Sequence, residues 1–169
     1  MIVEKRLAHI AAFAIEKEEE NVYFRSHIKS MDATTIDEMA YELNKVVSAV
    51  IDCTTCGNCC NKLVINVEPE DAISCANGLG LPKNKFIEQY IEVSEGGKYF
   101  INTIPCHFLS DKKCTIYPHR FTDCREFPHL HKPGFKERLL GTLLHYGNCP
   151  IIYNVIEEMK LKTGFVVYD

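Results

Sequence analysis

Apolar side chains recur at helical spacing near the start of the chain. A run of Glu and Lys residues at 16–20 separates two apolar groups. The first group contains Leu7, Ile10 and Ile15, and the second contains Phe24 and Ile28. A repeat of this kind is typical of amphipathic helices, because every third or fourth side chain returns to the same face. The pattern predicts one or two helices within residues 2–31.

A clearer helical pattern occupies residues 36–50, directly before the first cysteine. The apolar positions on its inner face are Ile36, Met39, Ala40, Leu43, Val46, Val47 and Val50. Thr35 and Glu38 have the spacing of a capping box, in which the threonine accepts from the backbone N–H of the glutamate and the glutamate reaches back. We therefore expect a helix that begins at Ile36.

Shorter elements are predicted for the rest of the chain. Strands are expected at 63–67, 98–104 and 138–146, and helices at 69–78, 81–92 and 151–162. Pro69 and the acidic residues after it suit a helix start, and Gly96-Gly97 suits a hairpin turn.

These elements predict a small α+β fold with N-terminal helices, a short antiparallel sheet and a cysteine-rich lobe organised by metal. A length of 169 residues suits one structural domain. Within it we distinguish an N-terminal helical segment (1–52), a cysteine-cluster metal-binding region (53–150) and a C-terminal helix with a tail (151–169).

The charge balance argues against two classes of partner. The net charge of -4 and the absence of a dense Lys/Arg cluster argue against nucleic-acid binding. Charged residues interrupt the N-terminus before an export signal or a membrane-length apolar run could form. We therefore expect a cytoplasmic protein that binds neither nucleic acid nor membrane.

Eight of the nine cysteines form one ordered pattern. They are Cys53, Cys56, Cys59 and Cys60, followed singly by Cys106, Cys114, Cys124 and Cys149. In a reducing cytoplasm, clustered cysteines act as metal ligands or redox groups rather than as disulfides. We predict that all eight are metal ligands. The ninth, Cys75, lies outside the pattern and is interpreted as buried packing.

The eight thiolates can be divided in more than one way. A C-x2-C-x2-C run with a distant Cys-Pro is similar to the ferredoxin arrangement and indicates one cubane set. Because consecutive side chains usually point apart, Cys60 is not expected to share an ion with Cys59 and is left for a second set. The sets would be Cys53, Cys56, Cys59 and Cys149, and Cys60, Cys106, Cys114 and Cys124. One cluster with four reactive or structural thiols is the other division. We predict an iron–sulfur cluster, [4Fe-4S] before other types, with zinc as the alternative that the same spacing allows.

Four blocks of sequence resemble the CxxCxxCC family of YkgJ-type cysteine-cluster proteins. The blocks are Cys53-Thr-Thr-Cys56-Gly57-Asn-Cys59-Cys60, Pro105-Cys106-His-Phe108-Leu109, Cys114-Thr-Ile116-Tyr117-Pro118-His-Arg120 and Cys124-Arg125-Glu-Phe127-Pro128. The resemblance implies zinc or iron chelation. The same domain occurs in flagellin lysine-N-methylase, so methyl transfer enters by analogy alone. The chain departs from the family pattern at Phe121, where a proline usually follows the arginine.

Three functions follow from these observations, the third being metal storage or delivery, which would need exposed and labile thiolates. The first is a cysteine-ligated metalloprotein whose cluster takes part in redox chemistry or in the modification of a protein or small molecule. The alternative is a zinc-stapled structural or interaction module without catalysis. Arg120 and Arg125 would place positive charge beside Cys124 or pair with carboxylates.

Overall fold

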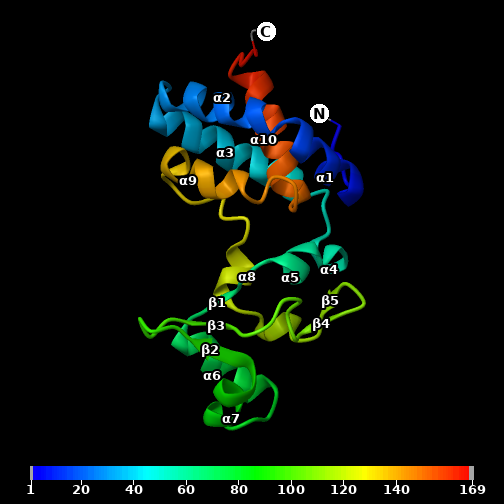
Figure 1. The fold of residues 1–169 in the computed structure, drawn as a ribbon, viewed down its shortest axis with the longest axis vertical. Coiled ribbons are helices and arrows are strands. Elements are labelled where there is room, and N and C mark those ends of the chain that lie inside the picture. The colour runs from blue at the N-terminus through cyan, green and yellow to red at the C-terminus, as the bar shows by residue number, and fades with distance from the viewer. Residues whose placement is uncertain (1, 168–169) are drawn as a thin grey trace. The chain divides into compact units, whose positions relative to one another are not determined.

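Helices occupy both ends of the sequence, and short strands lie in its middle (Figure 1). The computed structural model describes residues 2–167, so the last two positions of the predicted tail, 168 and 169, lie outside it. The chain forms two compact units. Residues 1–52 and 128–169 form the first, which we call the helical unit, and Cys53–Phe127 form the second, the cysteine unit. The predicted α+β class is confirmed.

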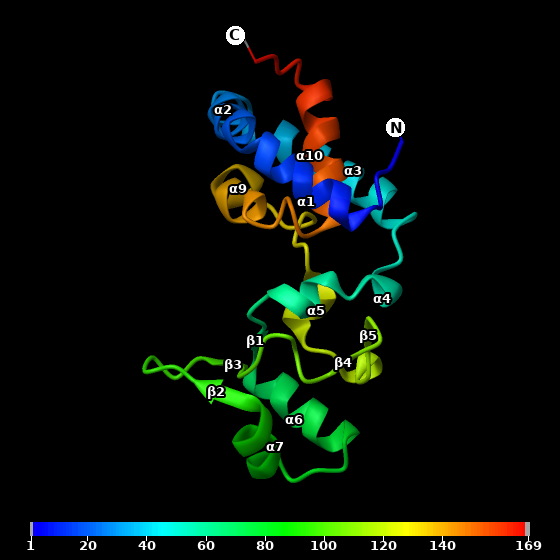
Figure 2. The ribbon, with the colours of Figure 1, turned by 45° about the vertical axis from the view of Figure 1, so that its right-hand side comes forward.

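Within the described range, five helices make up the helical unit. They are α1 (Leu7–Glu16), α2 (Glu18–Lys29), α3 (Ala33–Ser48), α9 (Phe135–Leu143) and α10 (Pro150–Lys162). Helix α10 packs along α3, and α9 packs against α2 and α3 (Figures 1 and 2). Phe24, Ile36, Leu139 and Ile156 are fully buried in this unit. The helices predicted within 2–31 and at 151–162 are therefore confirmed.

Helix α3 begins earlier than the capping box predicted. Its N-cap is Asp32, whose carboxylate accepts from the Thr35 backbone N–H and from the Thr35 hydroxyl, both at 2.8 Å. An aspartate that satisfies two donors is a strong N-cap, so the helix starts at Ala33 and not at Ile36. The proposed pairing of Thr35 with Glu38 at a helix start is wrong.

The segment predicted as a strand at 138–146 is mostly helical. Asp37, on α3, accepts from the backbone N–H groups of Gly134 and Phe135, both at 2.8 Å, and so caps the start of α9. Leu139 is buried while Leu140 is exposed, as a one-sided helix requires. The paired leucines in this segment fit both the helical repeat and the strand repeat. The cap that Asp37 supplies from α3 favours the helix.

An ionic network lies between the helices of this unit. Lys160, which is 5% exposed, donates to Glu20 and Glu157 at 2.7 Å each, and the Tyr146 hydroxyl donates to Glu157 at 2.8 Å. Lys17 also donates to Glu157. Burial by itself would raise the pKa of Glu157, but the hydrogen bonds from Lys160 and Lys17 outweigh it and hold that pKa below its usual value.

The cysteine unit contains two small antiparallel sheets. Strands β1 (Asn66–Val67), β2 (Ile91–Val93) and β3 (Tyr99–Ile101) form one sheet in the order β1-β3-β2, and β4 (Leu109–Ser110) pairs with β5 (Lys113–Cys114) in the other. The strands predicted at 63–67 and 98–104 are present but shorter. Such short strands have few ladder hydrogen bonds, so the unit depends on its packed side chains.

The helices of this unit flank its sheets. They are α4 (Cys53–Cys56), α5 (Asn58–Lys62), α6 (Pro69–Gly78), α7 (Lys83–Tyr90), the 3-10 helix η1 (Tyr117–His119) and α8 (Thr122–Glu126). Phe86, Phe108 and Phe121 lie in its apolar cluster. Cys75, on α6, is fully buried, and its thiol donates to the backbone oxygen of His119 at 2.7 Å, in agreement with the packing role predicted for it. Among residues 2–167 no helix has the length and apolar character needed to span a bilayer.

Candidate metal centre

Seven of the eight predicted ligands belong to the cysteine unit. Cys53 and Cys56 lie on α4, Cys59 and Cys60 on α5, Cys106 before β4, Cys114 on β5 and Cys124 on α8. Cys149 belongs to the helical unit, where it is buried and occupies the N-cap position of α10. The cubane set that combines Cys149 with the first three cysteines stays a prediction.

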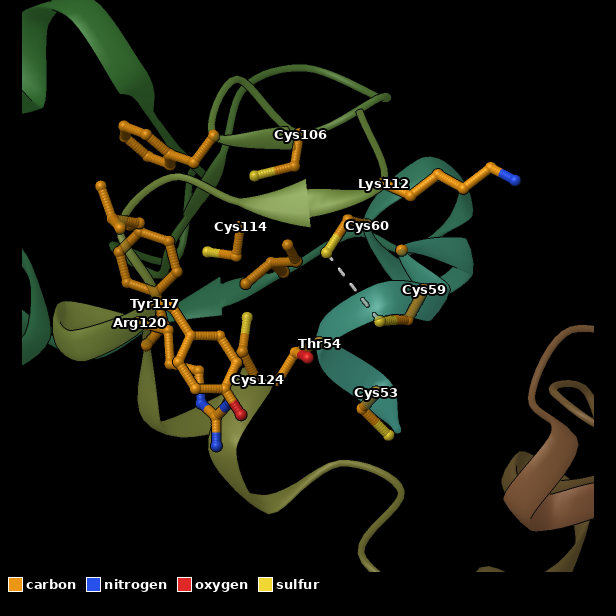
Figure 3. Close-up of a pocket in the computed structure, with 15 residues that line it drawn as sticks. Cys53, Thr54, Cys59, Cys60, Cys106, Lys112, Cys114, Tyr117, Arg120 and Cys124 are labelled. Atoms are coloured by element: carbon orange, nitrogen blue, oxygen red, sulfur yellow. Dashed lines mark hydrogen bonds between the residues drawn. The ribbon is translucent and has the colours of Figure 1, made fainter. Parts of the chain in front are cut away.

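Six of the predicted ligands line one cavity of about 70 Å³. They are Cys53, Cys59, Cys60, Cys106, Cys114 and Cys124. Figure 3 shows Cys60, Cys106, Cys114 and Cys124 around the same cavity, with Cys53 at its edge. One water requires only about 10–15 Å³ measured in this way, so the cavity has room for a metal ion. Segments far apart in the sequence thus bring soft donors to one place.

Apolar side chains form part of the cavity wall. Ile65, Phe108, Ile116 and Phe121 line it, and all four are buried. Three of the thiols, those of Cys60, Cys114 and Cys124, also pack against the apolar cluster of the unit. The cavity is therefore continuous with the hydrophobic core. A metal bound there would be shielded from water on its inner side.

Gly57 determines how the first four cysteines meet the hairpin. It lies between α4 and α5 with φ of +61°, a left-handed conformation that favours glycine. A Cβ at this position would stand 2.7 Å from the backbone oxygen of Lys112 and 2.8 Å from its Cα. The contact brings α5 against the turn between β4 and β5, and a hydrogen bond of 2.8 Å from the Cys106 N–H to the Cys60 oxygen adds a second tie.

The sulfurs of Cys59 and Cys60 lie 3.9 Å apart (Figure 3). Two ligands of one tetrahedral zinc ion stand about 3.8 Å apart when each Zn–S bond is about 2.3 Å. The expectation that consecutive side chains point apart is wrong here. It holds for a strand, whereas successive side chains in a helix such as α5 are rotated by only about 100°.

The thiols differ in their readiness to ionise. A hydrogen bond from the Cys60 thiol is the main reason why the pKa of Cys59 falls to about 7, and the Arg120 guanidinium adds to this. Hydrogen bonding to Cys59 and burial raise the pKa of Cys60, and burial chiefly raises the pKa of Cys124 to about 12. Burial likewise raises the pKa of Cys106 and Cys114. A bound cation must displace these protons, so metal affinity should increase with pH.

The two predicted arginines take different roles. Arg120 lines the cavity and stacks on the Tyr117 ring at 4.0 Å, where it supplies positive charge to the thiolates. Arg125 instead forms an ion pair of 3.2 Å with Asp71. The Asp71 carboxylate also accepts from the Thr122 N–H at 2.7 Å and from the Thr122 hydroxyl at 3.0 Å. It thereby anchors α8, the helix that carries Cys124.

Sequence reasoning did not find this role of Asp71. The residue lies in the first turn of α6, where an acidic side chain is explained by the helix dipole alone. Its partners are more than fifty residues away, and no local pattern connects them. The one available signal was an acidic residue at a position that the helix pattern places on the inner face.

The donor set fits a soft cation in kind, although the sulfurs are not drawn together around one point. Across residues 2–167 no three His, Cys, Asp or Glu side chains stand close enough to share an ion. Thiols with raised pKa values keep their protons and have no reason to converge until a cation replaces those protons. Thiolate ligands suit zinc and iron, and no histidine is among the described residues that line the cavity.

Comparison with known proteins adds one finding. Residues 52–143 match the model of the CxxCxxCC family, whose description is "Putative zinc- or iron-chelating domain". The match covers the whole cysteine unit and extends through α9, and it ends before Cys149. No curated protein and no solved structure shows significant similarity to the chain.

Proposed function

Because the chain belongs to the CxxCxxCC family, we propose that it is a metal-binding protein whose cysteine unit holds one zinc ion through Cys60, Cys106, Cys114 and Cys124. The observation that supports this assignment most directly is that these four cysteines, from four separate segments, line one cavity (Figure 3). Four thiolates complete a tetrahedral site of the structural type.

The ion would stabilise the cysteine unit. The two-residue strand β5 and the five-residue helices α5 and α8 carry three of the four ligands, and elements of this length are not stable by themselves. The ligands also pack against the apolar cluster, so an ion at their centre would join α5, β5 and α8 into one core. Structural zinc sites contribute their binding free energy directly to folding.

Arg120 has a clear task in such a site. Four thiolates around one divalent ion leave two excess negative charges, which a nearby guanidinium offsets. Arg120 lies in the cavity wall, and its stacking on Tyr117 fixes its position. The apolar residues around the thiolates would limit the access of water and of competing ligands.

An iron–sulfur cluster with a redox or protein-modification role is the second candidate. The observation that favours it is the C-x2-C-x2-C run of Cys53, Cys56 and Cys59, a spacing used for cubane ligation. In a cubane each thiolate binds a different iron, so the protein would contain iron and sulfide in equal amounts. Zinc alone would argue against this role.

Metal analysis with a visible spectrum, on full-length protein purified without oxygen, tests both candidates. We expect one zinc per chain and no visible colour, with the ion lost in Cys114→Ser. Cys75→Ser is the matched control, because Cys75 is buried in the same unit but does not line the cavity. A brown protein that bleaches with dithionite would show that an iron–sulfur cluster is bound in place of zinc. Retention of the ion in Cys114→Ser would refute the proposed site.

A further inference from the structure

The cysteines that line the cavity differ in exposure. Cys53 is exposed, Cys59 and Cys60 are half-buried, and Cys106 is 8% exposed. All four line the same cavity. Cys114 and Cys124, which also line it, are half-buried as well, so Cys53 offers the most accessible thiol to a metal ion that arrives from solvent. Cys56 lies on the same short helix as Cys53, one turn away.

Cys59 links the rim of the cavity to its interior. Its sulfur is 3.9 Å from that of Cys60, which is close to the distance between two ligands of one tetrahedral ion. An ion bound to Cys59 can thus gain Cys60 as a ligand before it loses its outer ligand. Figure 3 shows Cys59 and Cys53 on the same side of the cavity, while Cys106, Cys114 and Cys124 lie across from them.

We propose that Cys53, Cys56 and Cys59 form a loading relay, which captures a soft divalent cation at the rim and passes it to the inner thiolates. This inference rests on the proposed function, since it requires the inner site to be the destination. Each transfer is a substitution of one thiolate for another. The incoming thiol releases its proton to water as its sulfur binds the ion, the outgoing sulfur takes up a proton, and no atom changes oxidation state.

The short helix α4 suits an exchanging site better than a permanent one. It has four residues, none of them buried, and it packs against β5, the strand that carries Cys114. The inner thiols, in contrast, lie on or beside elements that pack into the apolar cluster. Rim thiols on an exposed turn can change partners at little cost, whereas the inner thiols are held by the core.

The test follows exchange of the bound ion in zinc-loaded, full-length protein. Cadmium(II) is added, and the release of zinc is followed with a zinc-specific dye. For Cys53→Ser/Cys56→Ser we expect an unchanged content of one zinc per chain, while exchange becomes slower by about tenfold, the lower end of the effect that residues around a metal site have on affinity or activity. Thr55→Ser, in the same turn, is the matched control and should exchange like the wild type. Cys59→Ser should slow exchange as well.

Each other outcome is decisive. Exchange at the wild-type rate in the double variant would overturn the relay. Loss of the ion in the double variant, or a wild type with two ions and a variant with one, would overturn it too, because the rim thiols would then be permanent ligands. If the wild type holds no thiolate-bound ion, the proposed function itself fails together with the relay, and metal analysis separates that result from an unchanged exchange rate.

Discussion

Replacement of Gly57 by alanine should weaken metal binding through geometry alone, because no ligand is altered. The added methyl group would stand 2.7 Å from the Lys112 backbone oxygen, and the residue would keep a φ of +61°. A left-handed conformation costs a residue with a Cβ about 1–2 kcal/mol. Insertion of a methyl group into packed surroundings costs about 1–3 kcal/mol, and the atoms that must yield here are backbone atoms.

Of these two costs only the second, about 1–3 kcal/mol, is relieved if α5 moves away from the β4–β5 turn. That movement would separate Cys60 from Cys114, on the other side of the contact. The affinity for zinc should then fall by about fivefold or more, since about 1.4 kcal/mol corresponds to a factor of ten. Competition with a chelator of known affinity measures the change.

Gly80→Ala is the matched control. Gly80 also has a positive φ, of +68°, in the same unit, but a Cβ there would meet no atom within 4 Å. It should lose about 1–2 kcal/mol of unfolding free energy and keep its zinc affinity. Equal zinc affinity in Gly57→Ala, Gly80→Ala and the wild type would refute the reasoning, because the contact with Lys112 would then have no part in placing the ligands.

Three further predictions concern the anchors of the two units and the ion itself. Asp71→Ala should lower the unfolding free energy by about 1–3 kcal/mol in urea titrations, because the Arg125 pair and the capping of α8 are lost together; an unchanged midpoint would show that α8 needs no anchor. The pKa of Glu157 is lowered, so its stabilising effect is complete above its usual 4.5 and is lost as pH falls through the lower folded value. Stability should therefore fall more steeply in acid for the wild type than for Glu157→Gln, and parallel curves would contradict this. Removal of zinc by a chelator should increase proteolysis within Cys53–Phe127 more than within α3 or α10, as limited digestion with mass spectrometry would show; equal protection with and without zinc would count against a structural ion.

Local patterns in the sequence predicted the pieces of the fold better than their connections. The cysteine spacing indicated a thiolate site, and six of the eight predicted ligands line one cavity. The period of apolar residues predicted the helix of α10 correctly but could not choose between helix and strand at 138–146, where Asp37 decides from another helix. The pairing of Asp71 with α8 was likewise invisible, since it joins residues that become neighbours only after folding.

The relation of Cys59 to Cys60 shows a different kind of error. The assumption that consecutive side chains diverge depends on a strand-like backbone, and these two residues lie in a helix of five residues. Neither the hydrophobic period nor the propensities of Asn58 and Lys62 predict so short a helix, because nucleation of a helix is unfavourable and short helices depend on tertiary contacts. Gly57 and its contact with the Lys112 backbone supply that context.

The helical unit is interrupted in the chain, since the whole cysteine unit stands between α3 and α9. A ribosome therefore completes Cys53–Phe127 while the first three helices still lack α9 and α10, the helices against which α3 packs. Domains generally fold as units in the order of synthesis, so the thiol-rich segment would acquire its structure and meet its first metal ion during translation, before the helical unit is complete. The supply of metal at that moment would then influence how much of the newly made chain reaches its native state.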